Sequence, residues 1–99
     1  MTTTQLQHKP GTQDQINGTS YKGTIFATYK ELVEKFGNPN GESFDGKVKN
    51  QWIIDFGGGI VASIYDYKQN LNTGKPEDWH IGGKSPAVVQ LVGMAFKGE

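Results

Sequence analysis

The feature that most constrains the fold is a pair of apolar segments joined by three consecutive glycines. The segments read KVKNQWIIDF (residues 47–56) and IVASIYDYK (60–68), with Gly57, Gly58 and Gly59 between them. Both are rich in β-branched and aromatic residues, which favour strands. Glycine readily adopts the positive φ angles that a tight hairpin turn needs. The sequence therefore predicts an antiparallel β-hairpin with Gly58 and Gly59 as the turn residues.

This turn predicts which side chains share a face of the hairpin. One face is expected to be strongly apolar and to be covered by helices. Its expected cross-strand pairs are Phe56 with Val61, Ile54 with Ser63, Trp52 with Tyr65, and Asn50 with Tyr67. The opposite face places Ile53 against Ile64 in a polar frame, which makes this small patch a candidate for self-association or for a partner. Asp55 and Asp66 belong to that frame, and we interpret them as solvated strand residues rather than as a catalytic pair.

The segment TYKELVEKFGNP (residues 28–39) carries complete signals for a short helix. Thr28 and Glu31 have the spacing of a capping box, Gly37 suits the C-terminal end, and Pro39 prevents continuation. The apolar side chains fall on one stripe: Tyr29, Leu32, Val33 and Phe36. We expect an amphipathic helix docked on the sheet.

A second helix is expected over AVVQLVGMAF (residues 87–96), with Ser85 as N-cap and Pro86 at the first position. Its apolar residues surround nearly the whole axis, so this helix should be more buried than the first. We interpret Gly93 as a mark of close packing. The helix follows a short extended segment, DWHI (78–81).

The length of 99 residues fits a single domain. Residues 1–19 hold few large apolar side chains, which predicts a disordered N-terminal tail. YKGTIFA (21–27) is the first expected strand. Residues 20–99 are therefore predicted to form one α+β domain of order β-α-β-β-β-α, an antiparallel sheet with a central hairpin covered by two helices.

Charge and residue usage disfavour several classes of function. Lys plus Arg and Asp plus Glu each total 10, so no net charge attracts nucleic acid or an acidic membrane. Because the chain has no cysteine, it has no disulfide, thiol nucleophile or thiolate metal site. The first 20 residues contain no apolar run typical of a signal peptide or membrane span. We expect no metal, no cofactor and no membrane partner.

The stretch WHIGGKS (residues 79–85) combines residue types that often form ligand pockets. It directly precedes the second expected helix, whose free N–H groups and positive dipole end favour an anion. The stretch is not a P-loop, because Asp78 stands where that motif needs glycine. A capped turn without a ligand explains the same residues, and both interpretations stay open.

Aromatic residues near this turn extend the candidate site. Tyr65, Tyr67 and Trp79 are expected near the strand ends beside the long polar loop, where a planar ligand could stack, while Trp52 is expected in the core. The predicted ligand-binding residues are Tyr65, Tyr67, Trp79, His80, Gly82, Gly83, Lys84 and Ser85.

Catalysis has little support in the sequence. Of the two histidines, His8 lies in the expected tail, so a catalytic or metal centre would depend on His80 alone. We therefore expect a protein that is not an enzyme, with a small hydrolase using His80 as the least supported alternative.

Three motifs in the same order resemble an uncharacterised family of small proteins encoded by tailed bacteriophages. The segments are TYKELVEKFGNP, QWIIDFGGGIVASIYDYK and DWHIGGKS. Family members read roughly T-Y-x-x-L-x-x-x-F-G-x-P, W-x-I-x-F-x-D-G-x-V-A-x-I-Y-x-Y-K and W-H-I-G-G. The resemblance spans residues 24–92 and departs at the hairpin, where Gly58 replaces the family's aspartate.

The resemblance implies a phage origin and a location in the host bacterial cytoplasm. Phage proteins of this size often act by binding, either by sequestering a nucleotide-like signal of a bacterial defence system or by blocking a defence or host protein directly. The residues of the WHIGGKS turn favour the first role, and we expect a homo-oligomer. Direct inhibition, through the sheet's exposed side or through the loop NPNGESFDG (residues 38–46), is the alternative.

Overall fold

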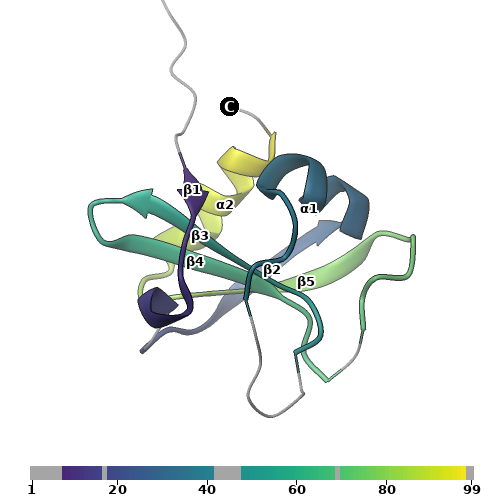
Figure 1. Cartoon of the computed structure of the whole chain (residues 1–99), viewed down its shortest axis with the longest axis horizontal. Helices are drawn as coiled ribbons and strands as arrows, with labels where there is room; N and C mark the ends of the chain where they lie inside the picture. The colour runs from purple at the N-terminus through teal and green to yellow at the C-terminus, as the bar shows by residue number, and fades with distance from the viewer. Residues whose placement is uncertain (1–7, 17, 42–47, 69, 98–99) are drawn as a thin grey trace, which may run out of the picture.

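The protein is a single antiparallel sheet with two helices on one side (Figure 1). The computed structural model describes residues 8–16, 18–41, 48–68 and 70–97. Along the chain the elements are β1 (Lys9–Pro10), the 3₁₀ helix η1 (Gln13–Ile16), β2 (Ser20–Ala27), α1 (Tyr29–Phe36), β3 (Gln51–Gly57), β4 (Ile60–Tyr65), β5 (Glu77–Gly83) and α2 (Ala87–Lys97). The strands are ordered β1-β3-β4-β5-β2. The predicted α+β fold, with its central hairpin, is confirmed.

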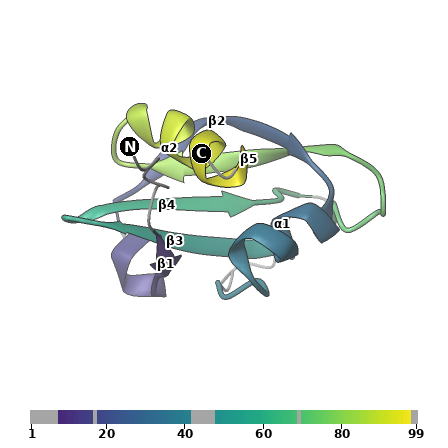
Figure 2. The ribbon, with the colours of Figure 1, turned by 90° about the horizontal axis from the view of Figure 1, so that it is seen from above.

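Two large indoles form the centre of the core beneath the helices. The rings of Trp52 on β3 and Trp79 on β5 meet edge to face, with centroids 5.2 Å apart. Both N–H groups are satisfied, because Trp52 donates to the Gly37 carbonyl at 2.7 Å and Trp79 donates to the Ala27 carbonyl at 2.9 Å. These bonds connect the sheet to both ends of α1. Seen from above, α2 lies over β5 and β2, and α1 lies beside β3 (Figure 2).

Helix α1 has the predicted boundaries and caps. Thr28 Oγ1 accepts the Glu31 N–H at 3.0 Å, and Glu31 Oε1 accepts the Thr28 N–H at 2.9 Å. Gly37 ends the helix with a positive φ of 84°. Leu32 is fully buried in the core. Local sequence signals therefore specify this element completely.

Helix α2 is more buried than α1, as predicted, since three of its residues are buried and α1 has one, Leu32. Val88, Val92 and Ala95 face the core, whereas Met94 is exposed. A Cβ atom at Gly93 would meet nothing within 4 Å, so the expectation of close packing at this glycine is wrong for the part of the chain that the structure describes. None of the helices within that part is long and apolar enough to cross a membrane.

The hairpin turns at Gly58 and Gly59 as predicted, but its strands pair one residue out of the predicted register. Gly57 pairs with Ile60, while Asp55 pairs with Val61, so Phe56 is an extra residue in a β-bulge. The bulge forms because Gly57 adopts a φ of 88° and donates its N–H to Asp55 Oδ1 at 2.7 Å. Three glycines in a row allow the bulged turn as readily as the simple one.

The bulge exchanges the faces of β4 relative to β3, because one residue of slip turns every side chain over. Ile64 lies opposite Trp52 in the core, and Ser63 lies opposite Ile53 on the other face. The predicted patch of Ile53 with Ile64 is therefore wrong. Both residues are buried, on different sides of the sheet.

Part of the predicted tail belongs to the fold. Residues Lys9 and Pro10 pair with β3, and the Gly11 N–H donates to the Ile53 carbonyl at 2.9 Å. The segment is held by backbone hydrogen bonds to the open edge of β3, which a count of apolar side chains does not reveal. It also covers Ile53, since a Cβ atom at Gly11 would touch that side chain. Residues 1–7 and 17 of the predicted tail lie outside the described residues.

Candidate functional site

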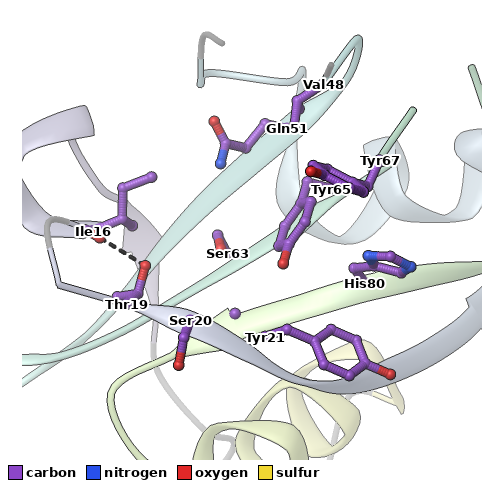
Figure 3. Close-up of a pocket in the computed structure, with 11 residues that line it drawn as sticks. Ile16, Thr19, Ser20, Tyr21, Val48, Gln51, Ser63, Tyr65, Tyr67 and His80 are labelled. Atoms are coloured by element: carbon purple, nitrogen blue, oxygen red, sulfur yellow. Dashed lines mark hydrogen bonds between the residues drawn. The ribbon is translucent and has the colours of Figure 1, made fainter. Parts of the chain in front are cut away.

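A pocket of about 600 Å³ opens on the face of the sheet that the helices leave uncovered. Its lining side chains on β3, β4 and β5 alternate along each strand with residues of the core. Figure 3 shows the residues that line it: Ile16, Thr19, Ser20, Tyr21, Val48, Gln51, Ser63, Tyr65, Tyr67, His80 and Gly82.

Four rings, which we call the aromatic cluster, form one side of the pocket: Tyr21, Tyr65, Tyr67 and His80. The imidazole of His80 lies at their centre. Its centroid is 5.1 Å from Tyr21 and 5.4 Å from Tyr65, both edge to face, and 6.2 Å from Tyr67, whose ring is inclined by only 29°. The cluster joins side chains from β2, β4 and β5 to Tyr67, which follows β4.

The floor of the pocket is polar and uncharged. Gln51, Ser63 and Gly82 come from three neighbouring strands and are all buried. A Cβ atom at Gly82 would lie 2.8 Å from Ser63 Oγ and 3.3 Å from Tyr65 Cε1. The absence of a side chain at Gly82 therefore allows the phenol ring of Tyr65 to lie across the floor.

The carboxamide of Gln51 is the polar group of this floor with unused hydrogen-bonding capacity. The residue is 7% exposed, and its Oε1 is buried without a hydrogen-bond partner among the described residues. In Figure 3 the amide nitrogen is turned toward the pocket. An unpaired buried acceptor costs about 1–3 kcal/mol, which a ligand or water that donates a hydrogen bond to it would recover.

The second side of the pocket is built from the segment predicted as tail. Ile16 ends η1, and Thr19 is fastened to it because Thr19 Oγ1 donates to the Ile16 carbonyl at 2.6 Å. The chain then enters β2 at Ser20. Without this segment the face would be an open sheet surface rather than a pocket.

Tyr67 is positioned by the buried carboxylate of Asp66. Asp66 Oδ1 accepts the backbone N–H groups of Lys49 and Asn50, at 2.7 and 2.9 Å, and Oδ2 accepts the N–H of Leu71 at 3.1 Å. The interpretation of Asp66 as a solvated strand residue is therefore wrong, because Asp66 is fully buried and has a structural role. It follows the end of β4, whereas Asp55 lies beside the hairpin turn at the other end of the strands, so the two carboxylates do not form a pair. The residue after Tyr67, Lys68, has a φ of 63° and places Nζ 5.4 Å from the Tyr67 ring.

The described lining of the pocket carries no fixed charge, and His80 is its one imidazole. None of the described lining residues is a lysine, arginine, aspartate or glutamate. Burial raises the pKa of the Tyr65 phenol above its ordinary value, and the phenols of Tyr21 and Tyr67 add to this effect. Tyr65 is therefore a protonated hydrogen-bonding group throughout the neutral range.

The eight residues predicted to bind a ligand are divided between two sides of the sheet. Tyr65, Tyr67, His80 and Gly82 line the pocket. The other four, which do not, are Trp79, Gly83, Lys84 and Ser85. Trp79 has 0% exposure in the core. The division follows from strand alternation, because Trp79 and His80 are neighbours in β5.

The anion seat expected before α2 lies on the helix side. A Cβ atom at Gly83 would collide with Val88 of α2, which shows that this glycine faces the helix. Ser85 caps the helix start, where its Oγ accepts the Ala87 N–H at 3.3 Å. Lys84 is exposed. These residues form a tight strand-to-helix turn, separate from the pocket.

Sequence reasoning missed the pocket residues Tyr21, Gln51 and Ser63. Tyr21 is distant in sequence from the predicted site and enters through the pairing of β2 with β5, in which it lies opposite Gly82. Gln51 and Ser63 were assigned to different faces by the incorrect register. The observed pairing of Gln51 with Tyr65 places Gln51 and Ser63 on the pocket side together with Tyr65.

The neighbours of His80 are phenol rings, and no carboxylate among the described residues accepts a hydrogen bond from the imidazole. Within the same residues, no group of three or more His, Cys, Asp or Glu side chains is arranged to hold a metal ion. A comparison of the chain with known protein families, curated proteins and solved structures finds no significant match.

Proposed function

We propose that this protein is a non-catalytic binding protein that holds a small, planar, nucleotide-like molecule in the pocket of the open face. The observation that carries the proposal is the aromatic cluster beside a buried, uncharged polar floor. Small-molecule sites typically have volumes of about 300–1,000 Å³ and apolar walls with a few polar groups that orient the ligand. The pocket of about 600 Å³ fits this description.

The aromatic cluster supports a planar ligand in particular. Stacking of a base on an aromatic side chain contributes about 1–3 kcal/mol, and it requires a ring with an accessible face. Tyr21 and Tyr67 are 56% and 39% exposed, so each retains accessible ring surface beside the pocket. Ser63 and the Gln51 carboxamide offer hydrogen bonds to the edge of the same ligand.

The biological role proposed for this binding is sequestration. The resemblance of three motifs to proteins of tailed bacteriophages supports a phage protein that counteracts bacterial defence by trapping a nucleotide-like signal in the host cytoplasm. Sequestration needs affinity and no chemistry, which agrees with a pocket of neutral polar groups and rings.

Thermal shift measurements with cyclic and linear nucleotides test the proposed function. We expect at least one ligand to raise the melting temperature, because a molecule that binds only the folded state stabilises it. His80→Ala should abolish the shift, since it removes the centre of the aromatic cluster. Lys84→Ala should retain the shift, since Lys84 does not line the pocket. If no ligand in the panel shifts the wild-type protein, the proposal is wrong.

The proposed homo-oligomer involves β2 rather than the patch expected from the sequence. β2 is an edge strand of eight residues, and Phe26 on it is 65% exposed. An uncovered edge strand offers backbone groups for pairing with another strand. Pairing of β2 with β2 of a second copy would continue the sheet and place a partner beside Tyr21 at the pocket.

Direct inhibition of a defence or host protein is the second candidate function, and the same edge favours it. A strand of a partner protein can extend an exposed sheet edge through main-chain hydrogen bonds. This candidate would gain support if the protein is monomeric and captures a bacterial protein only when Phe26 is intact. Most of the loop NPNGESFDG, the other surface considered for this role, lies outside the described residues.

A further inference from the structure

We infer that the pocket recognises the uncharged base of its ligand and leaves any phosphate in solvent, so that a nucleoside binds about as well as its phosphate ester. This inference rests on the proposed function and specifies which part of a nucleotide-like molecule the site reads. It follows from the charges, the hydrogen-bonding groups and the placement of lysines around the described pocket.

The first step is the charge of the lining. A phosphate removed from water needs cationic or strongly polarised partners, because an unpaired buried charge is very costly. The described lining offers rings, hydroxyls and one carboxamide, but no lysine or arginine. The backbone N–H groups at the start of α2, which are suited to an anion, lie on the helix side of the sheet. A phosphate inside the pocket would therefore have the His80 imidazole as its sole cationic partner among the described lining residues, and three phenol rings already surround that imidazole.

The second step is the chemistry of the Gln51 carboxamide. An amide side chain presents a donor and an acceptor side by side, which matches the paired donor and acceptor on the edge of a base. Gln51 turns its amide nitrogen toward the pocket, while its Oε1, which is unpaired among the described residues, is buried beside Gly41. A rotation of the amide about its last bond presents either group to the ligand.

The third step is the position of Lys68, which contacts a ring of the aromatic cluster. Lys68 lies over the Tyr67 ring, with Nζ 5.4 Å from the centroid, and it is not a lining residue. Its side chain is exposed, so its attraction for a phosphate at the mouth is weakened by water and salt. Lys68 can contribute to encounter with an anionic ligand without determining what the pocket holds.

Isothermal titration calorimetry on the full chain tests the inference. The probes are adenine, guanine, cytosine and uracil, each as free base, nucleoside and 5′-monophosphate, at low and high salt. For the base that binds, we expect the nucleoside and the monophosphate to agree within about threefold, with little effect of salt. Affinity at least about tenfold higher for the monophosphate, falling with salt, would overturn the inference while leaving the proposed function intact. Binding of none of the probes would also overturn the inference, and the proposed function would then depend on whether a cyclic nucleotide still raises the melting temperature.

Matched variants separate recognition of the base from recognition of phosphate. We expect Gln51→Leu to weaken nucleoside binding about tenfold, because it removes the hydrogen bonds to the base edge. Tyr65→Phe provides a second, milder change at the pocket should Gln51→Leu unfold the protein. Lys68→Ala and Lys84→Ala should change monophosphate binding by less than about twofold at high salt. A loss in either lysine variant with Gln51→Leu unaffected would contradict the inference.

Discussion

At the scale of single residues, the room around a glycine decides what its substitution does. Gly82 lies under the Tyr65 ring, where a Cβ atom would be 2.8 Å from Ser63 Oγ. Gly93 lies in α2, where a Cβ atom would meet no described atom within 4 Å. The two positions form a matched pair, because the same added methyl group enters a filled space in one and open space in the other.

We expect Gly82→Ala to destabilise the protein by about 1–3 kcal/mol through overpacking, and to impair ligand binding by displacing Tyr65. Gly93→Ala should stabilise it by about 1 kcal/mol, because alanine has the better helix propensity. Urea denaturation measures both free energies of unfolding. Destabilisation by Gly93→Ala would show that this face of α2 is packed against something in solution.

At the scale of elements, the turn of the β3–β4 hairpin is connected to the N-terminal segment through Asp55. Gln15 Nε2 donates to Asp55 Oδ2 at 3.0 Å, and the Gly57 N–H donates to Oδ1 at 2.7 Å. The hydrogen bond from Gln15 is the largest cause that lowers the pKa of Asp55, followed by the bond from Gly57. The ionised carboxylate therefore stabilises both the bulge and the attachment of η1.

The pH dependence of stability should report this connection. A carboxyl group whose pKa is lower in the folded state contributes stability above its unfolded pKa, near 3.8, and loses it as the pH falls through the folded value. Urea denaturation between about pH 7 and about pH 2 should show this loss, and Asp55→Asn should flatten the profile. An unchanged profile in the variant would show that Asp55 does not link the two segments.

At the scale of the whole molecule, the exposed edge of β2 predicts self-association. Phe26→Lys should give a monomer in light scattering coupled to size-exclusion chromatography, because a charge on an edge strand opposes pairing. Ile60→Lys is the control, since Ile60 is 46% exposed at the start of β4, which β5 separates from β2. A wild-type protein that is monomeric at its highest soluble concentration would contradict a homo-oligomer through β2.

The amino-acid sequence by itself determined the elements whose signals are local. The capping box at Thr28 and Glu31 and the three glycines of the hairpin act within a few residues, so helix α1, the turn and the fold class could all be predicted. Half of the residues predicted to bind a ligand do line the pocket. These are Tyr65, Tyr67, His80 and Gly82, which lie near the ends of predicted strands.

Only the tertiary structure decided which side chains share the pocket. One extra residue at Phe56 changes the face on which Ser63 and Tyr65 lie, and glycines permit either turn at similar cost. The pairing of β2 with β5 brings Tyr21 to His80, and hydrogen bonds from the N-terminal segment to β3 close the other side. These are contacts between residues distant in sequence, and their free energies depend on a register that no local pattern specifies.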